Sequence, residues 1–215
     1  MALDKAQQKH ILGAAIAVIL LLVLDQSSKV WVKTHMQLYD TIEVFSWFKI
    51  YFVENPGMAF GIDIIDTYIL TLIRIFFVCV LGVFIFNLIK RNFKFGFILC
   101  VSLVLAGALG NIIDCSFYGV LFDESYYGQV ASFRPEGGGY STFLHGRVVD
   151  MLYFPLIKST WPSWFPFWGG QELVFFRPIF NIADSSICVS AAIMFIFYRN
   201  SLSASFAKEK ETNDE

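Results

Sequence analysis

The residue best placed for chemistry is Asp184, in the segment Phe180–Ser186 that opens the last long apolar run of the chain. An ionised Asp at bilayer depth costs on the order of 3 kcal/mol even on a lenient insertion scale, so its presence indicates a function. Two carboxylates held close together share a proton. The ionised one can then take a proton from water while the neutral one polarises a peptide carbonyl. The segment therefore predicts one half of an aspartyl peptidase site.

Two residues are candidates for the second carboxylate. Asp114 closes the tetrad Asn111–Asp114, which repeats the Asn-Ile-x-Asp pattern of Asn181–Asp184, so spacing favours it. Asp150 follows a flexible loop and precedes an interfacial segment, so it could be presented where a peptide and a water must enter. Asp114 is expected at the C-terminal end of its helix, where exposed carbonyls disfavour an ionised carboxylate. That position suits a bracing role through hydrogen bonds to Asn181 or the loop.

Three more charges are predicted at a similar depth. Asp25 and Lys29 are i,i+4 neighbours on one face of a helix, and we expect an internal ion pair that makes their burial tolerable rather than direct catalysis. Arg74 is the only charge inside the second apolar run, roughly 12 Å from its outer end at helical rise. An acid on a neighbouring helix is its expected partner.

Other chemistries have weaker support. Ser27, Ser28 and Lys29 are adjacent and face different directions, and no His partners a Ser or Cys within an apolar run. Three of the four cysteines lie in apolar runs, where we expect small buried hydrophobes, and the three histidines lie outside the apolar cores. We therefore expect no metal and no cofactor. The net charge of −2, with basic residues at helix flanks, argues against a nucleic-acid partner.

The elements that must position these residues are membrane helices. The 215-residue chain is 56% hydrophobic with a mean hydropathy of +0.60, above the range of soluble domains. We predict a single all-α membrane domain over residues 1–215, with four transmembrane helices at about 11–32, 67–89, 95–115 and 179–199. The small residues of Ala106–Gly110 should let a neighbouring helix approach the third of these closely.

The basic cluster Lys90–Lys94 sets the orientation of the predicted helices. Under the positive-inside rule so short a basic loop stays in the cytoplasm, which places both termini there as well. Both Asn-Ile-x-Asp tetrads then lie near the outer surface of the membrane. We therefore expect a multi-pass membrane protein whose site lies close to the outer face.

Three segments are predicted outside the membrane. The period-two pattern over 38–62 predicts a small β-hairpin or cradle, which ends in a tight loop where Asn55 can hydrogen-bond a peptide and Gly57 permits close approach of the backbone. Residues 117–147 are polar and Gly-rich and are expected as an outer loop. Residues 152–180 are apolar but broken by prolines, and their many Trp and Phe residues suit the membrane interface.

Five motifs occur in order along nearly the whole chain, and together they resemble signal peptidase II, the prolipoprotein signal peptidase of bacteria. They are Asp25 with Lys29, Asn55-Pro56-Gly57-Met58-Ala59-Phe60, Gly110-Asn111-Ile112-Ile113-Asp114, Val148-Val149-Asp150 and Phe180-Asn181-Ile182-Ala183-Asp184.

The resemblance implies an enzyme of the bacterial cytoplasmic (inner) membrane that cleaves a signal peptide just before a cysteine carrying a diacylglyceryl group, at the outer, periplasmic face. Diacylglyceryl-modified prolipoproteins and membrane lipids would be its partners, and we expect a monomer. The resemblance implies that Asp150 and Asp184 are the catalytic pair. Asn55, Asn111, Asp114 and Asn181 would line or brace the site, and Asp25 with Lys29 would support it.

Two features depart from the family. The family usually has Arg directly after the Asp that corresponds to Asp114, whereas Cys115 stands here, and Arg147 or Arg74 could replace the lost guanidinium. The residues 117–147 also intervene before the Val-Val-Asp motif. A small transporter or scaffold is the non-enzyme alternative, because buried Asp and Arg also mark ion pathways. Transporters often contain inverted repeats, and the repetition of one four-residue pattern is too short to indicate such a repeat.

Overall fold

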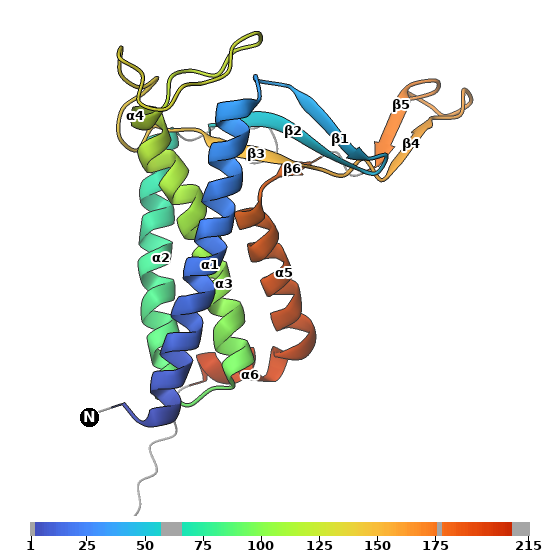
Figure 1. Cartoon of the computed structure of the whole chain (residues 1–215). Helices are drawn as coiled ribbons and strands as arrows, with labels where there is room; N and C mark the ends of the chain where they lie inside the picture. Colours follow the sequence, from blue (N-terminus) through green and yellow to red (C-terminus); the bar gives the residue numbers. More distant parts are fainter. Residues whose placement is uncertain (1–2, 57–65, 176–177, 208–215) are drawn as a thin grey trace, which may run out of the picture.

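The computed structural model describes residues 3–56, 66–175 and 178–207, and it consists of a helical bundle with a small antiparallel sheet at one end (Figure 1). The bundle helices are α1 (Lys5–His35), α2 (Thr67–Lys90), α3 (Phe95–Ile113) and α5 (Ile182–Phe197). The start of α1, the turn between α2 and α3, and the short α6 (Arg199–Phe206) lie at the end opposite the sheet.

Three of the described helices are long and apolar enough to cross a membrane: α1, α2, and α3 with its continuation to Leu121. The pair α5 and α6 makes a fourth candidate only if it is counted as one span, because the chain bends by 91° between them. After the bend, α6 ends at Phe206. Arg91 stabilises the C-terminal end of α6 by donating to the carbonyls of Ala204 and Ser205, at 3.0 and 2.8 Å.

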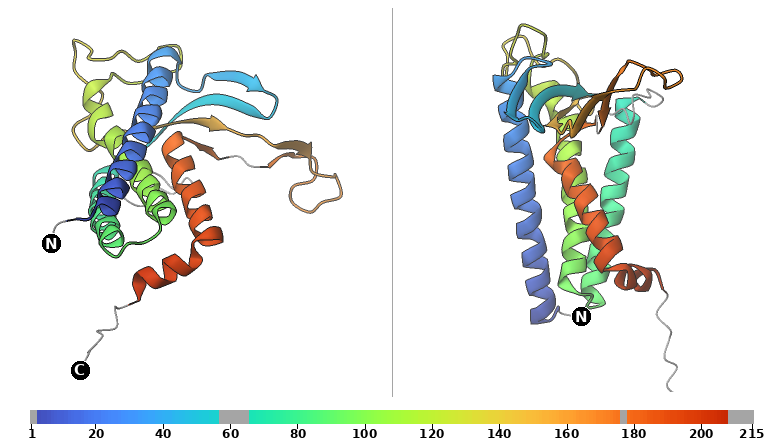
Figure 2. Two further views of the ribbon diagram at one scale, coloured as in Figure 1. Left: turned by 60° about the horizontal axis from the view of Figure 1, so that its bottom comes forward. Right: turned by 90° about the vertical axis from the view of Figure 1, so that its right-hand side faces the viewer.

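The helix α3 lies against α1, α2 and α5 (Figure 2). The prediction of a small-residue face is confirmed, because a Cβ added to Gly107 would stand 2.4 Å from the carbonyl oxygen of Ala183, and one added to Gly110 would stand 2.6 Å from Asp25 Oδ2. Cys100 is buried as expected. The same expectation is wrong for Cys79 and Cys188, which are exposed on the outer faces of α2 and α5.

The expected end of the third helix near Asp114 is wrong. The chain continues as a π-helical turn, η1 (Asp114–Tyr118), and then as α4 (Gly119–Leu121). Backbone carbonyls in this stretch are satisfied by the following loop, since Gly146 N donates to Cys115 O at 2.8 Å and Ser141 N donates to Gly119 O at 2.8 Å. Asp114 is therefore fully buried inside a helical stretch, and the argument from exposed terminal carbonyls does not apply to it.

The sheet has the strand order β1-β2-β3-β6, and every pair is antiparallel. Its strands are β1 (Thr41–Phe45), β2 (Phe48–Asn55), β3 (Val148–Tyr153) and β6 (Ile179–Phe180). The β1–β2 pair confirms the expected hairpin up to residue 55, while Gly57 and residues 58–62 lie outside the described part of the chain. Asp150 lies in β3, between β2 and β6, after the loop that follows α4.

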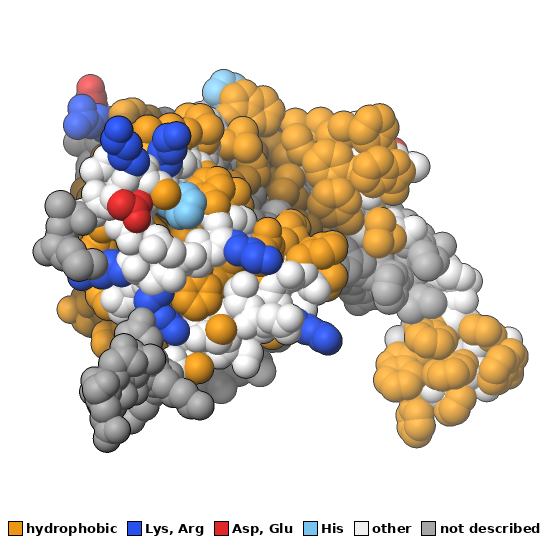
Figure 3. All heavy atoms as spheres, turned by 90° about the horizontal axis from the view of Figure 1, so that it is seen from below, with side chains coloured by type: hydrophobic (Ala, Val, Ile, Leu, Met, Phe, Trp, Pro, Cys, Tyr) orange, Lys and Arg blue, Asp and Glu red, His pale blue; other side chains and the backbone are white. Residues whose placement is uncertain are grey.

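The proline-rich stretch forms a second hairpin, β4 (Ile157–Thr160) with β5 (Glu172–Phe175), that projects away from the bundle (Figure 1). Its tip carries stacked rings, with Trp161 and Phe165 4.5 Å apart between centroids, and the neighbouring Trp164 and Phe167 are largely exposed. Seen from the helical end, hydrophobic side chains gather on this hairpin and beneath the overhanging sheet (Figure 3).

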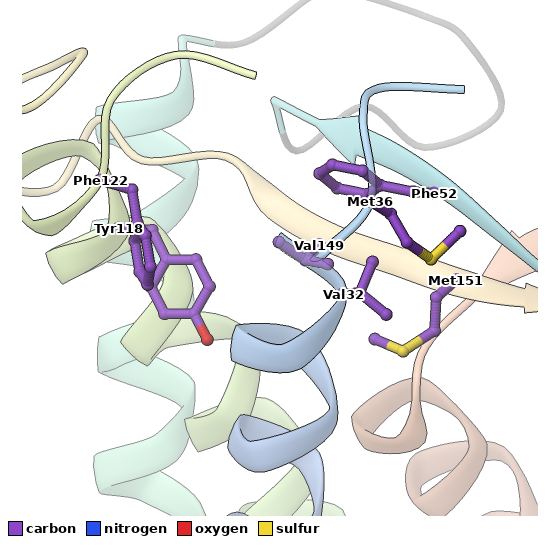
Figure 4. Packing of buried hydrophobic residues seen from close by; sticks show 7 residues of the cluster. All are labelled: Val32, Met36, Phe52, Tyr118, Phe122, Val149 and Met151. Carbon is purple, nitrogen blue, oxygen red and sulfur yellow. The ribbon is translucent and has the colours of Figure 1, made fainter. Parts of the chain in front are cut away.

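A hydrophobic core joins the sheet to the bundle (Figure 4). It is formed by Val32, Met36, Phe52, Tyr118, Phe122, Val149 and Met151. These side chains come from the end of α1 and its C-cap residue Met36, from β2 and β3, and from the π-helical turn with the residues after it. Because Val149 and Met151 flank Asp150 in β3, this packing holds the strand, and with it the carboxylate of Asp150, over the ends of the helices.

Candidate active site

Asn181 connects the two carboxylates that we expect to act together. It is the N-cap of α5, where its Oδ1 accepts the backbone N–H of Asp184 at 2.9 Å and its own N–H donates to Asp184 Oδ2 at 3.4 Å. Its Nδ2 donates to Asp150 Oδ1 at 2.8 Å. One fully buried residue therefore holds both carboxylates, that of Asp184 on α5 through its backbone N–H and that of Asp150 on β3 through its side-chain amide.

Asn111 on α3 provides a second amide for the same pair. Its Nδ2 donates to Asp184 Oδ1 at 2.8 Å, while its Oδ1 accepts from Asn181 at 3.1 Å and from Lys29 Nζ at 3.0 Å. Since an ammonium group can only donate, Lys29 fixes the oxygen of this amide toward itself and the amino group toward Asp184. The orientation of Asn111 thus follows from the charge beside it.

Lys29 lies at the centre of a buried ionic group behind the two amides. Its Nζ is 2.9 Å from Asp25 Oδ2 and 2.8 Å from Asp114 Oδ2, and its side chain is 0% exposed. The predicted i,i+4 ion pair between Asp25 and Lys29 is therefore confirmed. Two carboxylates around one ammonium leave a net charge of −1, and burial of such a group is tolerable only when hydrogen bonds satisfy the remaining oxygens.

Those hydrogen bonds connect the ionic group to the elements that carry the pair. Asp25 Oδ1 accepts the backbone N–H of Ala183 in the first turn of α5, at 2.9 Å. Asp114 Oδ1 accepts from Gln26 at 2.8 Å, and its Oδ2 accepts the N–H of Val149 in β3 at 3.4 Å. Asp114 therefore braces the strand next to Asp150, and no hydrogen bond or ion pair among the described residues joins it to Asp184 or Asn181.

The environment of Asp150 favours its protonated form. Burial raises the pKa of this carboxyl to about 7, and the nearby charge of Asp184 acts in the same direction. Hydrogen bonds from Asn55, at 3.4 Å, and Asn181, together with the charge of Lys29, oppose the shift. At neutral pH this carboxyl therefore exists in both protonation states, as a group that exchanges a proton during a reaction must.

An apolar groove of about 540 Å³ begins at Asp184. Its lining is formed by Leu152, Phe154, Pro178, Phe180, Asp184, Ser185, Cys188 and Val189. The groove therefore runs between the end of β3, the strand β6 and the outer face of α5, where Val189 is exposed. Its size suits a small ligand or one end of a long one, and among the described residues that line it Asp184 alone carries a carboxyl group.

The two arginines that we considered as replacements lie in different surroundings. Arg74 extends from α2 toward the π-helical turn, and its Nη1 is 3.4 Å from the sulfur of Cys115. An acid partner for Arg74 was expected, but none occurs among the described residues. Arg147 forms ion pairs with Glu54 and Glu124 and makes no described contact with either carboxylate of the pair.

Sequence reasoning missed Gln26, whose amide nitrogen donates to Asp25, Asp114 and the carbonyl of Gly110. A polar residue next to Asp25 within an apolar run was the available signal. It also missed the buried pair of Lys33 and Glu54, for which the sequence offers no local signal because 21 residues separate the partners. No group of His, Cys, Asp or Glu placed to hold a metal ion occurs in the described part of the chain.

Comparisons with known proteins bear on the identity of this arrangement. The family model described as "Signal peptidase (SPase) II" matches residues 17–199. A lipoprotein signal peptidase from Porphyromonas gingivalis is 50% identical over 205 residues, which cover 94% of this chain and 88% of that protein. One from Amoebophilus asiaticus is 34% identical, covering 90% of this chain and 80% of the other.

Solved structures agree on the fold. A bacterial membrane enzyme determined by the in meso method at 2.3 Å resolution superposes with a TM-score of 0.58, at 24% identity and over 93% of each chain. A second, determined at 1.9 Å resolution, gives a TM-score of 0.55 over 86% of this chain and 90% of that one. The bundle with its small antiparallel sheet is therefore the fold of a membrane enzyme.

Proposed function

Because this chain belongs to the signal peptidase II family, we propose that it removes signal peptides from prolipoproteins as an intramembrane aspartyl endopeptidase, with Asp150 and Asp184 as its catalytic pair. The observation that carries the proposal is Asn181, whose side chain hydrogen-bonds the carboxylate of Asp150 and the first turn that presents Asp184. No cofactor takes part in this chemistry.

Asp184 is the carboxylate that takes a proton from water. It accepts hydrogen bonds from Asn111 and Asn181, and it is the more exposed member of the pair. Asp150 in its neutral form donates its proton to the oxygen of the scissile carbonyl as water attacks the carbon. The tetrahedral intermediate then collapses, with the proton held by Asp184 passing to the leaving amine and the other returning to Asp150.

The lipid part of the substrate lies in the apolar groove beside Asp184. Leu152, Phe154 and Phe180 of this lining belong to the aromatic segment that we expect at the membrane interface, and the groove reaches the outer face of α5. A diacylglyceryl chain in the groove would bring the bond before the modified cysteine to the pair. Arg74, whose guanidinium lies at Cys115, is better placed than Arg147 to supply the arginine that the family has at that position.

The proposed orientation has four spans, with both termini and Lys90–Lys94 in the cytoplasm and the site near the periplasmic face of the inner membrane. The start of α1, the turn between α2 and α3, and α6 lie together at one end of the bundle, and the carboxylate pair lies at the other (Figure 1). That arrangement supports the topology. The protein acts as a monomer in this proposal, since one chain supplies both carboxylates and the groove.

The decisive experiment compares two substrates. Purified protein in lipid is given a diacylglyceryl-modified prolipoprotein and, in parallel, the same precursor without the lipid, and products are identified by mass spectrometry. We expect cleavage directly before the modified cysteine and much slower turnover of the unmodified form. Equal cleavage of both precursors would contradict the proposed recognition of the lipid. Cleavage of neither precursor would contradict the proposed function.

A further inference from the structure

A second buried charged cluster lies beside the active site and takes no part in the proposed chemistry. At its centre is the carboxylate of Glu54, whose side chain is 3% exposed. Lys33, fully buried in the last turns of α1, forms an ion pair with Glu54 Oε1 and donates to Ser125 Oγ at 2.9 Å. The same hydroxyl donates to Glu54 Oε1 at 2.8 Å, and Arg147 Nη1 lies 3.4 Å from Glu54 Oε2.

The residues around Glu54 come mainly from the loop that follows α4. Ser125, Tyr140 and Arg147 belong to this loop, and the ring of Tyr140 lies between the two cations, with its centroid 4.9 Å from Lys33 Nζ and 5.2 Å from the guanidinium carbon of Arg147. The phenol oxygen of Tyr140 also accepts the backbone N–H of Arg147 at 2.7 Å. The loop is therefore folded onto Glu54 by several independent contacts.

The position of Glu54 in the sheet connects this cluster to the active site. Glu54 and Asn55 are the last two residues of β2, and they pair with Val149 and Val148 of β3. Because consecutive side chains of a strand point to opposite sides, Glu54 faces the loop while Asn55 faces the carboxylate pair. Asn55 Nδ2 lies 3.4 Å from Asp150 Oδ2, at the long limit of a hydrogen bond, so a small displacement of the strand end would break it.

We infer that Lys33, Glu54, Ser125, Tyr140 and Arg147 form a clamp on the end of β2, and that Glu54 is a positioning residue that holds the amide of Asn55 on Asp150. The inference rests on the proposed function, and it assigns the polar loop of residues 117–147 a task in catalysis. The Asn55 hydrogen bond favours the ionised form of Asp150. Release of the clamp weakens this bond and therefore raises the pKa of Asp150. The groups that face Asp150 from other elements, Asp184, Asn181 and Lys29, remain in place.

The test measures kcat, KM and the pH profile of Glu54→Gln with a diacylglyceryl-modified prolipoprotein. We expect kcat to fall roughly 10- to 100-fold, the cost of a misplaced active-site group, with little change in KM. The alkaline limb of the profile should move to higher pH, because Asp150 loses a hydrogen bond that lowers its pKa. Glu43→Gln is the matched control, since Glu43 pairs with Lys49 on the exposed part of the same hairpin, and it should leave the profile unchanged.

A double-mutant cycle separates positioning from a general loss of stability. If Glu54 acts through Asn55, the double variant Glu54→Gln/Asn55→Ala should be no slower than Asn55→Ala alone. Multiplied effects of the two substitutions, or normal kcat in a folded Glu54→Gln protein, would overturn the clamp. Arg147→Ala should shift kcat and the profile in the same direction by a smaller factor, and it carries the test if Glu54→Gln does not fold. A change confined to KM in that variant would contradict the clamp as well.

The wild-type protein and Asp150→Asn are run in the same assay. An inactive wild type, or an Asp150→Asn variant with normal turnover, would refute the proposed function itself. An active wild type and an inactive Asp150→Asn, together with multiplied effects in the cycle, would refute the clamp alone.

Discussion

The tetrads Asn111–Asp114 and Asn181–Asp184 share one sequence pattern but differ in what surrounds them. Asp114 lies inside a continuous helical stretch, is fully buried, and has its oxygens occupied by Lys29, Gln26 and the backbone of Val149. Asp184 lies in the first turn of α5, is partly exposed, and lines the apolar groove. A helix N-terminus presents its carboxylate to a ligand, whereas a helix interior packed against a lysine encloses it.

The asparagines of the two tetrads differ in a related way. Asn181 caps its helix and bonds both members of the pair, whereas Asn111 lies within α3 and links Lys29 to Asp184. The first tetrad therefore connects the buried ionic group of Lys29 to the second tetrad through hydrogen bonds. In our proposal the second tetrad supplies one of the two catalytic carboxylates. Three measurements test this distinction: turnover after substitution of the proposed catalytic pair, thermal stability after substitution of Asp114, and the pH profile of cleavage.

The largest effect is expected from the catalytic pair. Asp150→Asn and Asp184→Asn should each reduce cleavage by several orders of magnitude in folded protein, because neither amide can exchange a proton with water or the carbonyl. The double variant should be scarcely slower than either single one, as residues that act as a unit behave. Turnover of the lipidated precursor measures this, with folding checked by thermal unfolding. Normal cleavage by Asp150→Asn beside a well-folded but inactive Asp114→Asn would move the catalytic assignment to Asp114.

A smaller and different effect is expected at Asp114. Asp114→Asn removes one of the two carboxylates around Lys29, and breaking a buried pair costs about 3–5 kcal/mol in the free energy of unfolding. The melting temperature should therefore fall clearly while turnover remains measurable. Asp66→Asn is a suitable control, because Asp66 is an exposed N-cap of α2 and Asn caps a helix equally well. An unchanged melting temperature would contradict the bracing role.

The smallest effect concerns the pH profile. In the proposed mechanism cleavage requires the proton on Asp150. Burial and the charge of Asp184 raise the pKa of this carboxyl from 3.8 to about 7, so kcat/KM should fall as the pH rises through about 7. The alkaline limb should keep its position in Asp114→Asn, since Asp114 neither gives nor takes a proton in the proposed reaction. A limb that moves by a full pH unit in that variant would mean that the two tetrads titrate together.

Several features could be predicted because they depend on neighbours in the sequence. The Asp25–Lys29 pair follows from an i,i+4 spacing, the β1–β2 hairpin follows from a period-two pattern, and the close approach of a neighbouring helix to α3 follows from Ala106–Gly110. The apolar runs predicted membrane helices, and the motifs predicted the family. Each of these signals lies within a short stretch of the chain. There the periodicity of the helix or strand determines the face on which a residue lies.

Other features were decided by the tertiary structure, because their partners are far apart in the chain. Val148–Tyr153 is a strand only because β2 and β6 border it, and the loop after α4 folds onto Glu54 through contacts with Lys33, 21 residues before Glu54 in the sequence. The different surroundings of Asp114 and Asp184 have the same origin. Two tetrads of the same pattern have different surroundings because Lys29 packs against one of them, and helix packing, which no local period encodes, determines which one.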